Sequence, residues 1–66
     1  MEFYLRLKEL RSKTQEKQIE VAEAIGCTVR QYQRFESGEQ KPGFENLWRL
    51  ADHFNVTVDF LMGRTG

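Results

Sequence analysis

The 66-residue sequence contains one cysteine and no long run of apolar residues. A single thiol, Cys27, cannot form an internal disulfide, which excludes a secreted disulfide scaffold and suits a reducing cytoplasm. No stretch is long and apolar enough to predict a signal peptide or a membrane span. These absences predict a cytoplasmic protein with no membrane association.

A net charge is also missing, because ten Lys and Arg residues balance ten Asp and Glu residues. A strongly basic domain would have indicated nucleic-acid binding directly, and this composition does not. The charge is unevenly placed, however: residues 1–34 carry seven basic against five acidic side chains (+2), and residues 35–66 carry three against five (−2). An ordinary mixed surface explains this small asymmetry equally well, so the local pattern has to decide.

Metal-binding and catalytic patterns are absent as well. One histidine, His53, and one cysteine, Cys27, do not make a zinc site. Ser37 and His53 fall on separate predicted helices, and nothing arranges them as a catalytic pair. We therefore expect no enzyme, no metal and no cofactor, with His53 at the surface or its boundary and Cys27 acting as a small apolar residue.

Apolar residues recur at the helical period almost throughout, and no segment alternates as a strand does. The sequence predicts five helices, over residues 2–13, 18–25, 29–37, 44–54 and 58–62. The clearest amphipathic run lies in the fourth: Phe44, Leu47, Leu50, Ala51 and Phe54. The fold class is all-α, and the length of residues 1–66 suits one small domain.

Capping residues mark several of the predicted helix ends. The candidate start residues are Thr28 and Thr57, and the candidate end residues are Gly26, Gly38 and Asn55. Thr28 and Gln31 also have the spacing of a capping box, in which each side chain bonds the backbone of the other. Only residues 26–28 separate the second helix from the third, which is the length of a helix-turn-helix connection.

The helix predicted over residues 29–37 has two contrasting faces. Arg30, Gln33, Arg34 and Ser37 share one face, and Tyr32, Phe35 and Glu36 share another. If the aromatic face lies inward, the Arg and Gln side chains point outward. Arginine pairs well with guanine and glutamine with adenine, and Val29 is suited to a thymine methyl group. A solvated helix face would use the same residue types, so spacing alone leaves both interpretations open.

Glu36 stands on the inward face of that predicted helix, in its last turn. A carboxylate there opposes the helix dipole, and a buried one costs several kcal/mol unless a cation reaches it. Either the position is more exposed than the periodicity indicates, or a basic side chain from elsewhere pairs with it.

The complete pattern resembles the Xre family, the helix-turn-helix domain of phage Cro and lambda-type repressors. The matching residues run without a gap from residue 3 to residue 64: Leu7-x-x-Leu10-Arg11, Gln18-x-x-Val21-Ala22-x-x-Ile25-Gly26-Cys27-Thr28, Tyr32-x-Arg34-Phe35-Glu36-x-Gly38, Lys41-Pro42, Leu47-x-x-Leu50-Ala51-x-x-Phe54-x-Val56 and Asp59-x-Leu61-Met62-Gly63-Arg64. This ordered set implies a compact five-helix, lambda-repressor-like domain whose second and third helices form the helix-turn-helix.

The resemblance also implies roles for individual residues. The acid of the third helix, Glu36, pairs with the arginine of the first, Arg11. The implied phosphate contacts are Gln18, Thr28 and Lys41, and the implied base-reading positions are Val29, Arg30, Gln33 and Arg34. The family therefore implies binding of double-stranded DNA at a palindromic operator, with repression as the expected activity.

Residues 15–17 depart from the family pattern, which often has Gly, an apolar residue and Ser or Thr before the glutamine. Without that cap, Thr14 could start the second helix earlier, or the first helix could run on. Either change would move Gln18 away from a phosphate. Lys17 is then an alternative phosphate contact, or an ordinary solvated lysine.

Repressors of this family commonly form homodimers, and an apolar patch suits that role. The candidate dimer residues are Trp48, Val58, Phe60 and Met62, while Leu61 is expected in the core. These aromatics could instead enlarge a thin core. A different class of function also stays open, because Xre-like domains serve as protein-interaction modules such as antitoxins. The sequence names neither the operator nor the regulated genes.

Overall fold

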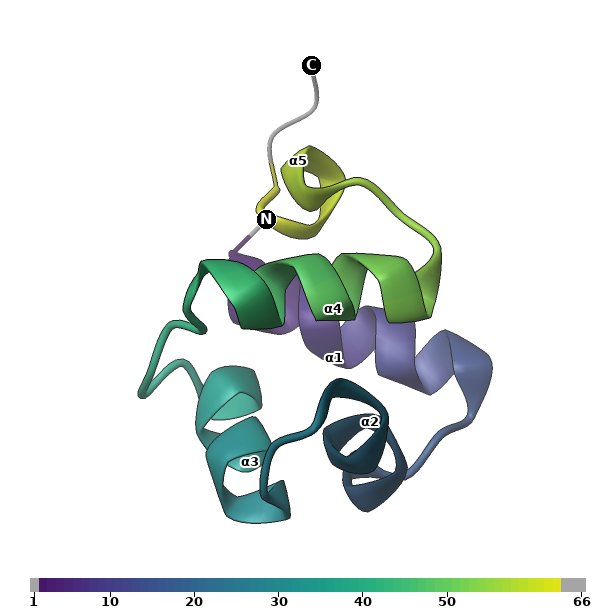
Figure 1. Ribbon diagram of the computed structural model, residues 1–66. Helices are drawn as coiled ribbons and strands as arrows, with labels where there is room; N and C mark the ends of the chain where they lie inside the picture. The colour runs from purple at the N-terminus through teal and green to yellow at the C-terminus, as the bar shows by residue number, and fades with distance from the viewer. Residues whose placement is uncertain (1, 64–66) are drawn as a thin grey trace.

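A computed structural model describes residues 2–63, which form five α-helices and no strand (Figure 1). The helices are α1 (Phe3–Thr14), α2 (Gln18–Ile25), α3 (Val29–Ser37), α4 (Phe44–Phe54) and α5 (Val58–Leu61). The all-α prediction is confirmed. The first helix lies one residue later in the chain than the periodicity predicts, and the last ends at Leu61.

The helices α2 and α3 pack against each other at one end of the molecule, and α5 lies at the opposite end (Figure 1). Between them, α1 contacts α3 and α5, whereas α4 contacts α2 and α5. Residues 26–28 make the short turn between α2 and α3. This arrangement leaves one side of α3 free of neighbouring helices.

Two threonines start helices as the sequence predicts. The Thr28 hydroxyl accepts a hydrogen bond from the Gln31 backbone N–H at 3.1 Å. The Thr57 hydroxyl accepts one from the Phe60 N–H at 3.0 Å. The return bond of the predicted capping box, from the Gln31 side chain to the Thr28 backbone, is not formed within the described part of the chain. The Gln31 side chain therefore does not make the hydrogen bond that the capping-box prediction assigned to it.

The predicted end residues of α2, α3 and α4 all adopt the left-handed conformation. Gly26 and Gly38 follow α2 and α3 with φ of 78° and 83°, and Asn55 follows α4 with φ of 56°. A Cβ at Gly38 would lie 3.0 Å from the Tyr4 ring, so both the dihedral angle and the space require glycine there. Gly38 thus ends α3 and lets α1 approach it.

At the junction between α1 and α2, the second helix keeps its predicted start at residue 18, and neither change that would have moved that start occurs. Thr14 does not begin the second helix; it is the last residue of α1, and Gln15 ends that helix in the left-handed conformation with φ of 58°. The Glu20 carboxylate then accepts a hydrogen bond from the Lys17 N–H at 2.7 Å. This bond is the half of a capping box that the third residue of the helix supplies, and it stabilises the start of α2 without a serine or threonine cap. The helix α2 consequently starts at Gln18.

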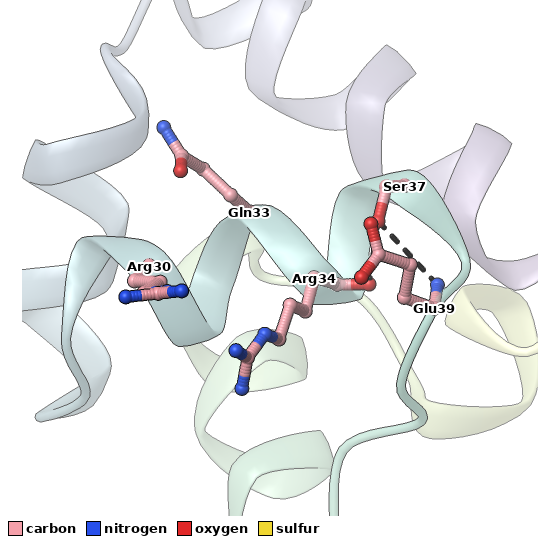
Figure 2. A pocket seen from close by; sticks show the side chains of 5 residues that line it. All are labelled: Arg30, Gln33, Arg34, Ser37 and Glu39. Carbon is pink, nitrogen blue, oxygen red and sulfur yellow. Dashed lines mark hydrogen bonds between the residues drawn. The ribbon is translucent and has the colours of Figure 1, made fainter.

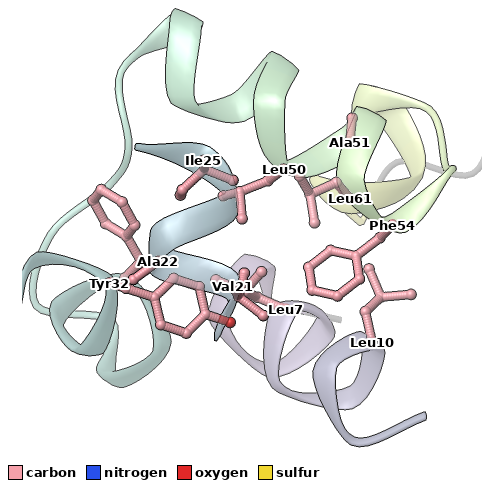
Figure 3. Close-up of a cluster of buried hydrophobic side chains, with 11 residues drawn as sticks. Leu7, Leu10, Val21, Ala22, Ile25, Tyr32, Leu50, Ala51, Phe54 and Leu61 are labelled. Atoms are coloured by element: carbon pink, nitrogen blue, oxygen red, sulfur yellow. The ribbon is translucent and has the colours of Figure 1, made fainter. Parts of the chain in front are cut away.

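The core lies where the inner faces of the helices meet (Figure 3). Its buried apolar residues are Leu7, Leu10, Val21, Ala22, Ile25, Tyr32, Phe35, Leu50, Ala51, Phe54 and Leu61. Phe44 is a correction, because the amphipathic run predicted it on the inner face of α4 and the structure leaves it 74% exposed. It lies in the first turn of α4 and meets the Trp48 ring edge-on, with 6.0 Å between the ring centres.

Candidate nucleic-acid interface

The outer face of α3 presents polar side chains that no other helix covers. Arg30, Gln33 and Arg34 are all exposed, as the sequence predicts for an outward face. With Ser37 and Glu39 they line a hollow of about 310 Å³ (Figure 2). Long donor side chains around a shallow hollow suit a ligand with many acceptor atoms, such as the edge of a base pair.

Val29 differs from the three polar residues of that face. It is half-buried and packs against the core cluster at the start of α3. Only the exposed part of the Val29 side chain can contact a partner. A base contact by Val29 would therefore use that small apolar surface.

The inner face of α3 fixes how the outer face is presented. Tyr32 and Phe35 are 0% and 1% exposed, and Glu36 is 2% exposed. The structure thus resolves the alternatives for Glu36: the acid is buried, and basic and polar groups reach it. A helix anchored along its whole inner face holds its outer side chains in one register.

Three side chains from three helices donate hydrogen bonds to the Glu36 carboxylate. The Arg11 guanidinium donates two, through Nε at 2.5 Å and Nη2 at 3.0 Å, in a forked arrangement. Tyr32 donates through its hydroxyl, and Gln18 through Nε2 at 3.1 Å. The ion pair implied between Arg11 and Glu36 is therefore present, and it joins α1 to α3.

These donors set the charge of the buried acid. Burial by itself would raise the pKa of the Glu36 carboxyl, but the hydrogen bonds from Arg11, Tyr32 and Gln18 outweigh it. The pKa of Glu36 consequently lies below its ordinary value. Burial, together with the hydrogen bond to the same carboxylate, raises the pKa of the Tyr32 hydroxyl. Glu36 is thus ionised at neutral pH and holds the neutral Tyr32 in place.

The side chain of Gln18, a predicted phosphate contact, forms hydrogen bonds with other residues of the protein. Its Nε2 donates to Glu36, and its Oε1 accepts a hydrogen bond from Gln33 Nε2 at 3.2 Å. Its backbone N–H, in the first turn of α2, has no acceptor within residues 2–63. The side chain therefore orients Gln33 in this structure, and the backbone N–H is the group left for an anion.

The other predicted phosphate contacts are exposed. Lys17 immediately precedes α2, Thr28 immediately precedes α3, and Lys41 lies in the loop between α3 and α4. The Thr28 hydroxyl accepts the capping bond and keeps its own hydrogen free to donate. Pro42, next to Lys41, is buried and anchors that loop to the body of the domain.

The predicted dimer patch is only partly exposed. Trp48 and Met62 are 50% and 37% exposed, but Val58 and Phe60 are half-buried and pack against the core. The Arg6 guanidinium also lies 4.1 Å above the Phe60 ring. The apolar surface is instead a groove of about 380 Å³, lined by Phe44, Trp48, Val56, Thr57, Val58 and Asp59. We call it the α4–α5 groove.

His53 lies at the surface boundary, where the sequence predicted it, but it has an unforeseen partner. Its Nε2 is 2.7 Å from Glu16 Oε2, so α4 is tied to the loop between α1 and α2. Burial would raise the pKa of Glu16, but hydrogen bonds from Thr14 and His53 lower it overall. No periodic signal could have found this contact, because it joins a loop to a helix 37 residues away.

Cys27 is half-buried in the turn before α3 and packs against the core, and burial raises the pKa of its thiol. Within residues 2–63, no three metal-ligating side chains gather in one place. None of the described helices has the length and apolar character needed to cross a bilayer.

A family model described as helix-turn-helix matches residues 6–61. Two curated relatives are each similar over 59 residues, or 89% of this chain: the cryptic phage CTXphi transcriptional repressor RstR of Vibrio cholerae, at 37% identity, and the HTH-type transcriptional regulator AnsR of Bacillus subtilis, at 41%. The match covers 53% and 51% of those proteins. The chain therefore spans about half the length of the curated relatives it matches.

Two solved structures share the fold. A transcriptional regulator from Listeria innocua superposes with a TM-score of 0.91 at 32% identity, over 98% of this chain and 61% of that one. The P22 c2 repressor, crystallised with a synthetic operator, superposes with a TM-score of 0.90 at 22% identity, over 94% of both chains. At that identity, the second likeness concerns the fold alone.

Proposed function

Since the chain belongs to the helix-turn-helix family of Xre type, we propose that it is a sequence-specific, double-stranded DNA-binding transcriptional regulator that acts as a repressor. The helix α3 would enter the major groove. The observation that carries the proposal is the contrast within α3: its inner face is anchored through Glu36, and its outer face presents Arg30 and Arg34 to solvent.

The outer side chains have the chemistry for base recognition. An arginine donates two hydrogen bonds to guanine O6 and N7, and a glutamine pairs with adenine N6 and N7. Arg30, Gln33 and Arg34 supply these groups within about one turn of helix. Gln33 is held by Gln18 at 3.2 Å, so part of its orientation is set before DNA arrives. Val29 adds a small apolar surface suited to a thymine methyl group.

Phosphate contacts would set the position of α3 in the groove. The candidates are the exposed side chains of Lys17, Thr28 and Lys41, with the free backbone N–H of Gln18 at the start of α2. A helix N-terminus favours an anion because its N–H groups and dipole both point toward it. Each phosphate neutralised by a lysine releases counterions, so binding should weaken as salt rises.

Repressors that read palindromic operators bind as symmetric dimers, with half-sites about 34 Å apart. We propose a homodimer whose interface includes Phe44, Trp48 and Val58 of the α4–α5 groove, together with the exposed Met62 outside it. Support comes from Phe44 and Trp48, which are 74% and 50% exposed and would be covered by a second copy. Phe60 supports this interface from the core side, because its ring packs against the core cluster and beneath the Arg6 guanidinium.

A second function is supported by the same groove. An exposed apolar surface of this kind also fits a protein-interaction module, such as an antitoxin that binds another protein. Such a module needs no base-reading helix, whereas Arg30 and Arg34 stand exposed on α3. That difference favours DNA recognition. In either function we propose binding without catalysis, in the cytoplasm and without a cofactor.

Selection of bound duplexes from a random DNA pool tests the proposal. The intact chain is compared with Arg30→Ala/Arg34→Ala and with a control, Lys8→Ala/Lys13→Ala, that removes the same charge from exposed positions of α1. We expect a palindromic motif from the wild type and the control, lost in the α3 variant. Equal weak, salt-sensitive binding to all sequences by the wild type would refute base recognition and direct attention to a protein partner.

A further inference from the structure

One acid lies among the cationic and amide side chains of the α3 hollow. Glu39 lines it together with Arg30, Gln33, Arg34 and Ser37 (Figure 2). It stands outside the helix, two residues beyond Ser37, so helical spacing gave no reason to place it there. The geometry points to a role in choosing the DNA sequence.

The turn after α3 holds Glu39 in this position. Gly38 adopts the left-handed conformation with φ of 83°, which folds the chain back beside the helix. The Glu39 N–H points to Ser37 Oγ at 3.4 Å, and the Gln40 N–H donates to the Arg34 carbonyl at 3.2 Å. Since the backbone is fixed on both sides, the carboxylate extends from a defined point at the rim of the hollow.

The Glu39 carboxylate is not used by the fold. The side chain is exposed, and no cation pairs with it among residues 2–63. In this it differs from Glu36, which is buried against Arg11, and from Glu45, which pairs with Arg49 at 2.5 Å. Stability of the domain therefore does not explain why an acid stands here.

General attraction to DNA does not explain it either, because a carboxylate repels phosphates. At the edge of a base pair, however, it has a selective effect. It accepts a hydrogen bond from the N4 amino group of cytosine, whereas guanine O6 and thymine O4 are acceptors that repel it. The N6 amino group of adenine stands beside the N7 acceptor, which also repels a carboxylate. An acid beside arginines therefore adds a favourable contact for one base and an unfavourable one for others.

We infer that Glu39 is a specificity-determining residue that selects a cytosine at one position in each half-site, next to the bases contacted by Arg34. This inference rests on the proposed function of α3 and deepens it. The arginines supply affinity for guanine, and Glu39 excludes sequences in which a guanine or thymine faces the end of the hollow.

The test is duplex selection with Glu39→Gln and Glu39→Ala, beside the wild type and Asp52→Asn. The control removes the same charge from an exposed site on α4, outside the hollow. Competition binding with single base-pair changes then gives the preference at each position. We expect the wild type to prefer cytosine at one position by about fivefold or more, the scale of a good base contact.

In Glu39→Ala that preference should fall to within about twofold while every other position keeps its own, and Glu39→Gln should turn it toward adenine. An unchanged motif in both variants, with affinity raised equally for all sequences as in Asp52→Asn, would overturn the inference and leave the proposed function intact. A wild type that enriches no motif would overturn both.

Discussion

The substitution Arg11→Ala should remove most of the domain's stability. Glu36 has a side chain that is only 3% exposed, and among residues 2–63 Arg11 is the one cation that pairs with it. Tyr32 and Gln18 would still donate hydrogen bonds, but neither neutralises the charge. Breaking a buried ion pair from one side typically costs about 3–5 kcal/mol. A domain of this size has about 3–10 kcal/mol in total, so the loss is decisive.

The assay is urea unfolding followed by far-ultraviolet circular dichroism, with Lys13→Ala as the control on the same helix. Lys13 pairs with Glu9 at 3.8 Å on the surface, so its loss should stay below about 1 kcal/mol. Adding Glu36→Gln to Arg11→Ala should recover part of the stability, because the stranded charge disappears. If Arg11→Ala costs no more than Lys13→Ala, the buried pair does not hold α1 to α3 and the reasoning is wrong.

The hydrogen bonds around Glu36 predict that the stability of the wild type and that of Arg11→Ala respond to pH in opposite directions. In the wild type the pKa of Glu36 is lowered, so its stabilisation is present above the unfolded pKa of about 4.3 and is lost as pH falls through the folded value. In Arg11→Ala, burial should instead favour the protonated acid. The difference in unfolding free energy between the two should therefore shrink as pH falls from 7 toward about 4. A constant difference across that range would contradict this assignment.

Three further outcomes follow from single positions. Gly38→Ala should lower the free energy of unfolding in urea by about 1–3 kcal/mol, because φ is 83° and the new Cβ would meet the Tyr4 ring at 3.0 Å. A decrease under about 0.5 kcal/mol would contradict this. Trp48→Ser should shift sedimentation toward the monomer with an unchanged circular dichroism spectrum, and an unaltered dimer would exclude the α4–α5 groove as its interface. Lys41→Ala should weaken binding to all DNA sequences alike and make the salt dependence shallower by about one unit; a change in sequence preference would contradict a phosphate role.

Helical periodicity predicts the inner faces well because it fixes the angle of each side chain around its axis. Tyr32 and Phe35 are buried and Arg30 and Arg34 exposed, as spacing requires. Periodicity does not show how far the neighbouring helices extend along α4. For this reason it wrongly predicts Phe44 on the buried face. It has the correct angle on α4 but lies in the first turn, where it meets the edge of the Trp48 ring and stays 74% exposed.

Loop contacts escape sequence patterns for a different reason. Gln15 adopts a left-handed conformation that the usual glycine rule does not anticipate, and it separates α1 from α2. Glu16 then reaches His53, a contact that depends on how the whole fold closes. Glu39 likewise enters the hollow only because Gly38 turns the chain back. In each case a backbone turn, and not a residue spacing, brings the side chains together.

The neutral net charge is compatible with a DNA-binding face because of where the acids lie. Glu36 forms an ion pair with Arg11 in the interior. Glu16 lies against His53, and Glu45 pairs with Arg49 on α4. None of these carboxylates reaches the α3 hollow, where two arginines stand without an ion pair among the described residues. A phosphate or a base experiences that local field, since charges beyond about 8 Å are largely screened at physiological salt. Total charge is therefore a poor guide for this chain, and the one acid left inside the hollow, Glu39, is the charge whose removal tells most about sequence choice.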